Sequence, residues 1–164
     1  MVRWLPPPSG AFKLNFDGSC KCTSVAAGII LIDNNVKTSS PVPFNMGNTQ
    51  VYMAEPLGLH KGIQEAIRLN IKGDNLLVIN AVKGVWKIPW KLQNIINDIK
   101  LLLQQFHSFH IQHIFREANR ATDWIANVGH LIVHPDVGFC WSWRVTLYTE
   151  EVMARIKQTA NVGA

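Results

Sequence analysis

Four acidic residues of this 164-residue chain lie where the sequence pattern predicts strand ends or helix starts. Asp17 follows the apolar end of a predicted strand, and Glu55 lies near the start of a predicted helix. Asp74 stands at a possible strand end before another helix, and Asp123 lies in the first turn of a later one. Strand ends and helix starts can meet at one edge of a layered α/β sheet, so we expect these carboxylates to converge. Their mutual repulsion requires a cation, and hard oxygen ligands favour Mg²⁺ or Mn²⁺.

A pair of such ions, about 3.5 to 4 Å apart, supports phosphodiester hydrolysis. One ion activates water for in-line attack, and the other stabilises the departing 3′ oxygen. A second interpretation stays open at this point. Taken singly, Asp74 and Asp123 are better explained as plain helix-start charges that interact favourably with the helix dipole.

The elements that must position these residues begin with three predicted strands, over residues 12–16, 24–33 and 36–44, joined by short turns as an antiparallel meander. The spacing of hydrophobic residues then changes to that of a helix, with Asn48 or Thr49 as its predicted cap.

A second helix is predicted from Asn75 to Gly84, and a third over residues 92–106. Residues 109–115 read as a strand, and Asn119 is predicted to cap a helix that Gly129 closes. This order predicts an α/β layered domain with a mixed sheet. We expect a proline-rich linker, a domain and an irregular tail with a possible helix over its residues 149–158, within these bounds: 1–10, 11–130 and 131–164.

The composition fits a folded domain with a polyanionic partner. Hydrophobic residues make up 48% of the chain, and 16 Lys and Arg against 11 Asp and Glu give a net charge of +5. No run approaches the roughly 18 to 20 apolar residues that span a bilayer, and the N-terminus lacks a signal-peptide core. Three cysteines, with Cys20 and Cys22 separated by one residue, predict free thiols. We therefore expect an intracellular protein, with nuclear or cytoplasmic placement left open.

Four sequence blocks resemble plant ribonuclease H-like domains, many of which descend from the RNase H region of non-LTR retrotransposon polyproteins. The blocks are "WLPPPSGAFKLNFDGS", "MAEPLGLHKGI", "KGDNLLVINAVKG" and "HIFREANRATDWIANVGH", and they span roughly Trp4 to His130. The resemblance implies a three-layer fold, with a mixed five-stranded sheet of three antiparallel strands followed by parallel ones. It also implies endonucleolytic hydrolysis of the RNA strand of RNA–DNA hybrids with two Mg²⁺ (or Mn²⁺) ions.

The resemblance assigns roles to particular residues. It implies that the metal ligands and catalytic acids are Asp17, Glu55, Asp74 and Asp123. His113, ten residues before Asp123, falls where the family has a mobile catalytic histidine. His113 is equally explained as a strand residue that faces a polar neighbour.

Residues beside these acids are candidates for contacts with the sugar–phosphate chain: Gly18, Ser19, Asn75 and Asn119. Such a domain, expected as a monomer, would recognise A-form-like geometry and 2′ hydroxyls instead of sequence. Four lysines form a candidate basic flank, or simply a solvated loop: Lys72, Lys83, Lys87 and Lys91. Trp86 and Trp90 could stack on bases, but packing on the core is the favoured interpretation.

Three departures from the family pattern bear on activity. Only nineteen residues separate Glu55 from Asp74, so either the first helix ends near Gly62 or Asp74 does not reach the sheet edge. Pro56 lies inside the predicted helix and is expected to kink it. The tail after residue 130 matches no pattern of the family.

Three hypotheses follow. The first is an active hybrid-cleaving ribonuclease. The second is a catalytically impaired nucleic-acid-binding or interaction domain, a retrotransposon relic whose site is broken at Glu55 or Asp74. The third, less favoured, is a nuclease of this fold that acts on DNA. The position of Asp74 relative to Asp17 separates the first two.

Overall fold

The computed structural model describes most of the chain from Pro6 to Ile132. The described residues are 6–35, 37–69, 71, 75–80, 90–113, 119–132 and 154, with the backbone alone described at 38–40, 75–80 and 111–113.

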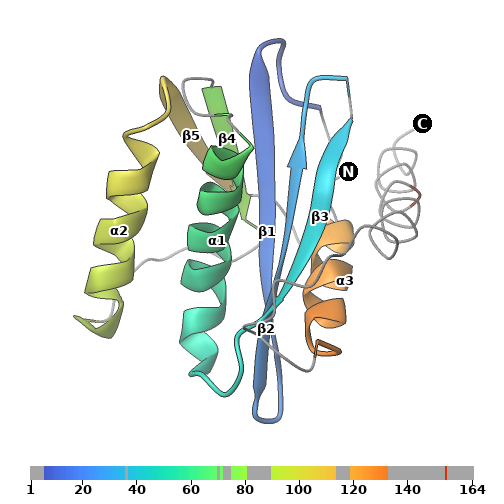
Figure 1. Ribbon diagram of the computed structural model, residues 1–164, viewed down its shortest axis with the longest axis vertical. Coiled ribbons are helices and arrows are strands. Elements are labelled where there is room, and N and C mark those ends of the chain that lie inside the picture. The colour runs from blue at the N-terminus through green and yellow to red at the C-terminus, as the bar shows by residue number, and fades with distance from the viewer. Residues whose placement is uncertain are drawn as a thin grey trace.

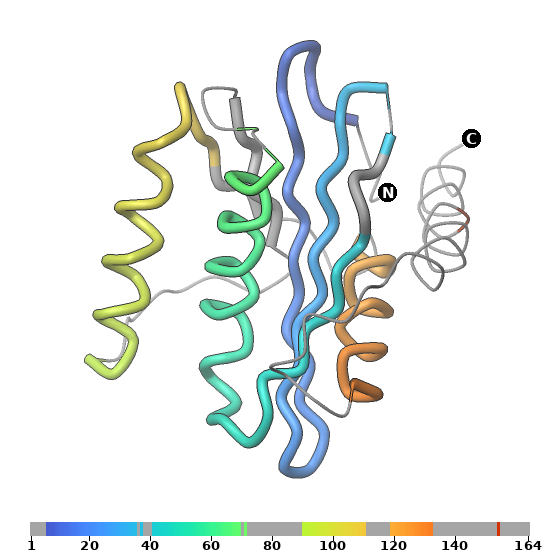
Figure 2. Tube along the Cα trace, viewed as in Figure 1, coloured from blue at the N-terminus to red at the C-terminus, as the bar shows by residue number. Residues whose placement is uncertain are grey.

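Three strands form the antiparallel meander that the sequence predicted. They are β1 (Ala11–Lys21), β2 (Ser24–Ile32) and β3 (Thr38–Asn45). β1 and β2 pair from Lys13 opposite Ile32 to Lys21 opposite Ser24, and Cys22 takes a positive φ of 50° in the tight turn between them. The long β1–β2 hairpin is visible at the lower end of the trace in Figure 2.

Two further strands extend the sheet on the other side of β1. They are β4 (Asn75–Asn80) and β5 (Ser108–His113), and both run parallel to β1. The strand order is β3-β2-β1-β4-β5, so the expected mixed five-stranded sheet is confirmed.

Helices cover both faces of this sheet. They are α1 (Ala54–Arg68), α2 (Gln93–Leu103) and α3 (Arg120–Gly129). α1 and α2 lie side by side over one face, and α3 packs on the other face against β1, β2 and β3 (Figure 1). The arrangement is a three-layer α/β/α fold.

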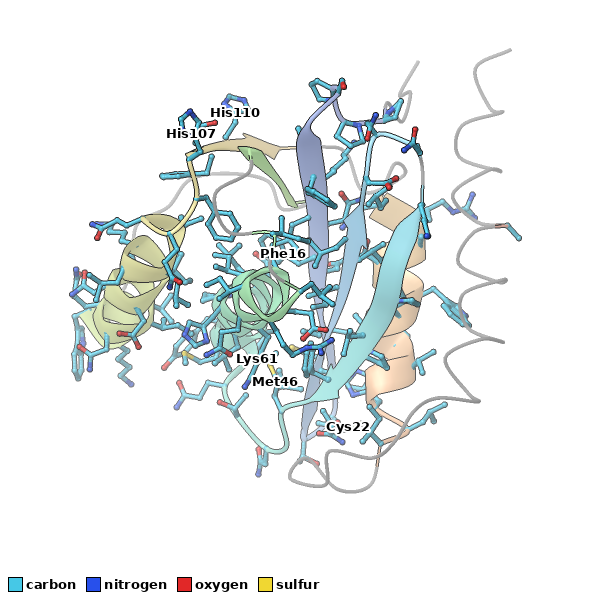
Figure 3. The ribbon with its side chains drawn as sticks, turned by 45° about the horizontal axis from the view of Figure 1, so that its top comes forward. Phe16, Cys22, Met46, Lys61, His107 and His110 are labelled. Carbon is cyan, nitrogen blue, oxygen red and sulfur yellow. The ribbon has the colours of Figure 1, made fainter. Side chains whose placement is uncertain are left out.

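Alternation along β1 and β2 divides the core into two layers. Leu14, Phe16 and Ile29 pack under α1 and α2, where Phe16 is labelled in Figure 3. Ile30 and Ile32 point the other way and pack against Ile125 of α3 and its neighbours. Successive strand residues face opposite sides, so both layers follow from the pattern of β2.

The contact between α3 and the sheet requires a glycine. A Cβ placed on Gly28 of β2 would lie 2.6 Å from the carbonyl oxygen of Thr122 and 2.9 Å from the carbonyl carbon of Ile125. Real Cβ atoms do not come this close to backbone atoms. α3 therefore approaches β2 at Gly28 more closely than any residue with a side chain would allow.

One predicted helix is wrong. Residues 75–80, expected to begin a helix, form β4, and residues 81–84 lie outside the described part. The run Leu76–Ile79 is apolar on every side, which suits a helix segment or a buried parallel strand equally. The open edge of β1 selects the strand, because β1 can then pair on both sides.

Two expectations about the first helix are also wrong. A 3₁₀ turn, Val51–Met53, precedes α1, so neither Asn48 nor Thr49 is its cap. Pro56 is consequently the third residue of α1, where a missing N–H costs nothing, and α1 continues without interruption to Arg68. The helix does not end early near Gly62.

The expected tail helix over residues 149–158 lies outside the described residues except for Ala154, which is helical. Within the described ranges, none of the helices is long and apolar enough to cross a bilayer.

Candidate active site

Asp17 lies at the point where β1 passes between the first turns of two helices. It is 7% exposed, and its Oδ1 accepts a hydrogen bond of 2.9 Å from the backbone N–H of Gly18. Phe16 faces α1, so alternation places the Asp17 side chain on the α3 face of the sheet, together with Lys13 and Asn15. A carboxylate this buried marks a specialised position rather than an ordinary surface charge.

The start of α1 contacts the residue after Asp17. A Cβ on Gly18 would lie 2.7 Å from the Cβ of Ala54 and 3.1 Å from the backbone nitrogen of Glu55. Glu55, in the first turn of α1, is half-buried. Burial raises the pKa of Cys20 on β1, and the negative charge of Glu55 raises it further, which places Glu55 within electrostatic range of that strand. The structure therefore brings β1 and the first turn of α1 together as the sequence predicted.

The start of α3 is tied to the residue before Asp17. Asn119 is 1% exposed, and its Nδ2 donates a hydrogen bond of 3.1 Å to the carbonyl oxygen of Phe16. Asn119 is the N-cap of α3 by position, but no side-chain capping bond forms. Its amide instead fixes α3 to β1, and this places Asp123, in the first turn of α3, on the same side of the sheet as Asp17.

A hydrogen-bond network that sequence reasoning missed connects the β1–β2 hairpin to α3. His130 contacts Ser24 Oγ through Nδ1 at 2.8 Å and Ser19 Oγ through Nε2 at 3.0 Å. Ser19 Oγ also donates to Asn127 Oδ1 at 3.3 Å, and Asn127 Nδ2 donates to the carbonyl oxygen of Asp123 at 2.8 Å. Ser19, proposed as a substrate contact, is thus already engaged within the domain.

The pKa of His130 is lowered, first by burial and second by the positive charge of Lys21. A neutral imidazole suits a position between two serine hydroxyls, which can each donate or accept. The sequence feature that could have indicated this network is the pair Ser19 and Ser24 near the hairpin turn. The pairing of β1 with β2 brings both serines close to α3.

The end of β4 that lies beside Asp17 does not carry the expected acid. Asp74 itself is outside the described residues, but the next residue, Asn75, pairs with Ala11 at the start of β1. β4 then runs parallel to β1 until Asn80 pairs with Phe16. Asn75, a candidate substrate contact, therefore lies at the end of β4 away from Asp17.

His113 is placed by its backbone at the expected edge. It is the last residue of β5 and pairs with Asn80, which in turn pairs with Phe16. Its side chain is outside the described part, so its catalytic role stays a prediction.

An exposed aromatic residue marks the start of the α2 region. Trp90 is 81% exposed, and the Nζ of Lys91 lies 5.8 Å from the centroid of its ring, a cation–π geometry. The favoured interpretation of Trp90 as a core residue is wrong. Trp86 and the other three lysines of the candidate basic flank lie outside the described residues.

The resemblance implies divalent ions held by carboxylates at this edge of the sheet. Among the residues with described side chains, no three or more His, Cys, Asp or Glu lie close enough together to hold a metal ion. Asp17, Glu55 and Asp123 belong to elements that contact one another. The fourth acid, Asp74, directly precedes Asn75, which lies at the end of β4 away from Asp17. The described residues alone do not make up a four-carboxylate centre, and Asp74 lies outside them.

Comparison with known proteins agrees with the fold. Residues 15–129 match the family model described as reverse transcriptase-like. An Arabidopsis thaliana protein provisionally named a ribonuclease H protein is 25% identical over 134 residues, which cover 77% of this chain and 22% of that protein. The chain thus spans about a fifth of this curated relative.

Solved structures of ribonucleases H resemble the domain. RNase H1 of the archaeon Halobacterium salinarum has a TM-score of 0.66 at 20% identity, covering 73% of this chain and 97% of that one. LC11-RNase H1, solved in complex with an RNA/DNA hybrid, has a TM-score of 0.66 at 17% identity, covering 73% and 96%. At these identities the likeness establishes the ribonuclease H-like fold.

Proposed function

Since the chain belongs to the reverse transcriptase-like family, we propose that it is a ribonuclease H-type domain that binds RNA–DNA hybrids and hydrolyses their RNA strand. The observation that carries this proposal is the placement of Asp17. A buried carboxylate lies at the junction of β1 with the first turns of α1 and α3, and two more acids, Glu55 and Asp123, belong to those turns. The LC11 relative was solved with the same class of duplex.

The geometry of the surrounding elements supports nucleic-acid binding. α1 and α2 both begin at the end of the sheet where β1 finishes (Figure 1). Helix N-termini favour anions, because their free N–H groups and the helix dipole point outward there. Trp90 and Lys91 lie directly before α2 and offer a stacking ring beside a cation. The net charge of +5 favours a polyanion as well.

Within this proposal each described residue has a specific task. Asp17 supplies the buried carboxylate at the centre, and Gly18 keeps α1 close to it. Asn119 holds the start of α3, with Asp123, against β1.

A labelled RNA–DNA hybrid incubated with the purified domain and Mg²⁺ or Mn²⁺ tests the proposal, beside an Asp17→Asn control. We expect the wild type to bind the hybrid in preference to duplex DNA and to release RNA fragments faster than the control. Hybrid binding no tighter than that of duplex DNA would contradict the proposal.

A second candidate function is favoured by the register of β4. If the wild type binds hybrid but cleaves no faster than Asp17→Asn, the domain is a hybrid-binding relative with impaired catalysis. The position of Asn75 opposite Ala11 is the specific observation behind this alternative.

A further inference from the structure

Two cross-links between β1 and α3 flank Asp17. In the first cross-link, the carbonyl oxygen of Phe16 accepts a hydrogen bond of 3.1 Å from Asn119 Nδ2. In the second cross-link, Ser19 Oγ donates a hydrogen bond of 3.3 Å to Asn127 Oδ1. Ser19 lies two residues after Asp17, so both side chains point to the α3 face of the sheet. The stretch of β1 that carries Asp17 is thus held to α3 at both of its ends.

The same two cross-links flank Asp123 on α3. Asn119 lies four residues before Asp123, and Asn127 lies four residues after it. At about 1.5 Å per helical residue, the two asparagines lie about 12 Å apart along the helix axis. At about 3.3 Å per strand residue, Phe16 and Ser19 lie about 10 Å apart along β1. The two spans nearly match, so β1 and α3 run side by side between the cross-links.

The second cross-link belongs to a hydrogen-bond network whose direction can be deduced. Asn127 Nδ2 donates to the carbonyl oxygen of Asp123 at 2.8 Å, so Asn127 Oδ1 is the atom that faces Ser19. The single hydroxyl proton of Ser19 is used for that acceptor. Ser19 Oγ must then accept from His130, so Nε2 of His130, at 3.0 Å, carries the ring proton. Nδ1 of His130 is left to accept from the hydroxyl of Ser24 at 2.8 Å.

This arrangement needs a neutral imidazole, and the surroundings of His130 favour one. Burial lowers the pKa of His130, and the positive charge of Lys21 lowers it further. A doubly protonated ring would have to donate through both nitrogens, which would reverse the bond at Nδ1. At neutral pH the network therefore runs in one direction, from the hairpin through His130 to the backbone of Asp123.

We propose that His130 is a positioning residue of the candidate site. Its Nε2–H holds Ser19 Oγ in the orientation that donates to Asn127. The second cross-link then fixes the separation of Asp17 and Asp123 at one end, as the first cross-link does at the other. This inference rests on the proposed function for the importance of that separation, because groups that act on one phosphodiester must keep their mutual geometry.

Two substitutions at position 130 distinguish the two nitrogens of the ring. The amide nitrogen of glutamine is as many bonds from Cα as Nε2, so His130→Gln keeps a donor for Ser19 and loses the contact with Ser24. The amide group of asparagine extends only as far as Nδ1, so His130→Asn keeps a contact with Ser24 and loses the donor for Ser19. Both side chains are uncharged amides, and thermal melts of the full chain identify a temperature at which both variants are folded.

Cleavage of a labelled RNA–DNA hybrid is then compared at that temperature. We expect kcat of His130→Asn to fall about tenfold and that of His130→Gln to stay within about twofold of the wild type, because a displacement of about 1 Å can cost up to about 100-fold. KM should not change in either variant. Equal loss of kcat in the two variants would overturn the proposal.

Ser19→Ala removes the second cross-link itself and gives an independent comparison. We expect it to lower kcat by the same factor as His130→Asn, again without a change in KM. A rise in KM with kcat unchanged would show that Ser19 binds substrate instead, and would overturn the proposal. If His130→Asn does not fold, Ser19→Ala takes its place beside His130→Gln.

Two measurements without substrate test the network independently of the proposed function. Proton–nitrogen NMR of the wild-type imidazole should show His130 protonated at Nε2 alone, and a proton at Nδ1 alone would overturn the proposal. Backbone amides in the last turn of α3 should exchange with solvent about fivefold faster in His130→Asn than in His130→Gln, the factor expected for one net hydrogen bond. Equal exchange would also overturn it. If both results are as expected but the wild type cleaves no hybrid, the proposed function fails and the cross-link stands.

Discussion

Asn119 donates a hydrogen bond from Nδ2 to the carbonyl oxygen of Phe16, at 3.1 Å, and both residues are almost fully buried. Phe16 precedes Asp17 and Asn119 precedes α3, so this bond joins two segments of the candidate site that lie 103 residues apart in the chain.

Replacing Asn119 by alanine should therefore weaken the attachment of α3 to β1 and lower the unfolding free energy of the domain. Removing the donor leaves a buried carbonyl oxygen without this bond, which typically costs about 1 to 3 kcal/mol of unfolding free energy. Urea denaturation measures the loss, with Gln93→Ala on the exposed start of α2 as the control. A variant as stable as the control would show that the Phe16 bond contributes little.

Gly28→Ala should disrupt the contact between β2 and α3. The added Cβ would lie 2.6 Å from the carbonyl oxygen of Thr122, so α3 must move away from the sheet. We expect a loss of about 1 to 3 kcal/mol, the usual range for overpacking, and weaker hybrid binding because Asp123 moves with α3. A matched substitution is Gly58→Ala in α1, where the nearest contact of the new Cβ is 3.1 Å and the cost should be smaller. Equal stability of Gly28→Ala and the wild type would contradict the close approach.

Lys13 should make the unfolding free energy of the domain depend on pH in the alkaline range. Burial lowers the pKa of Lys13 from 10.5 to about 8, so between these values the unfolded chain binds the proton and the folded chain does not. The unfolding free energy of the wild type, relative to that of Lys13→Met, should then rise with pH from about 8 to 10.5. The rise is at most about 3 kcal/mol. Other titrating groups are common to both proteins and cancel, so a pH-independent difference would refute this prediction.

Trp90→Ala should weaken hybrid binding and leave the fold intact. The ring is 81% exposed, so its removal should change the unfolding free energy by less than about 0.5 kcal/mol. If Trp90 stacks on a base, affinity for the hybrid should fall at least about fivefold, equivalent to the lower end of the usual stacking energies. Fluorescence anisotropy at fixed salt measures this change. Leu101→Ala, at an exposed position late in α2, is the control and should not change the affinity.

Much of the fold was predictable from the sequence, because in several elements the hydrophobic periodicity and the flanking turn residues indicate the same structure. The three-strand meander, the third helix and the helix after Asn119 follow from alternation or from a repeat of three and four residues. β4 was not predictable, since its apolar run has no alternation and only pairing with β1 decides its conformation. Likewise, the start of α1 depends on a 3₁₀ turn that propensities do not reveal.

The candidate site was predictable in its residue types and less so in its geometry. Asp17, Glu55 and Asp123 belong to elements that the structure brings together, as the sequence suggested. The role of Asn119 was missed because its partner, a backbone oxygen of β1, is far away in sequence. His130 was missed for the same reason, because its two serines become neighbours only in the hairpin.

The central claim is that Asp17 is the central carboxylate of a ribonuclease that cleaves RNA–DNA hybrids. One assay tests this claim most directly. A hybrid with a labelled RNA strand is incubated with wild type and Asp17→Asn at equal concentration in Mn²⁺ or Mg²⁺, with bound and cleaved RNA measured together. The account predicts that both proteins bind the hybrid and that only the wild type cleaves its RNA strand. Failure of the wild type to prefer hybrid over duplex DNA, or cleavage by the wild type no faster than by Asp17→Asn, would contradict it.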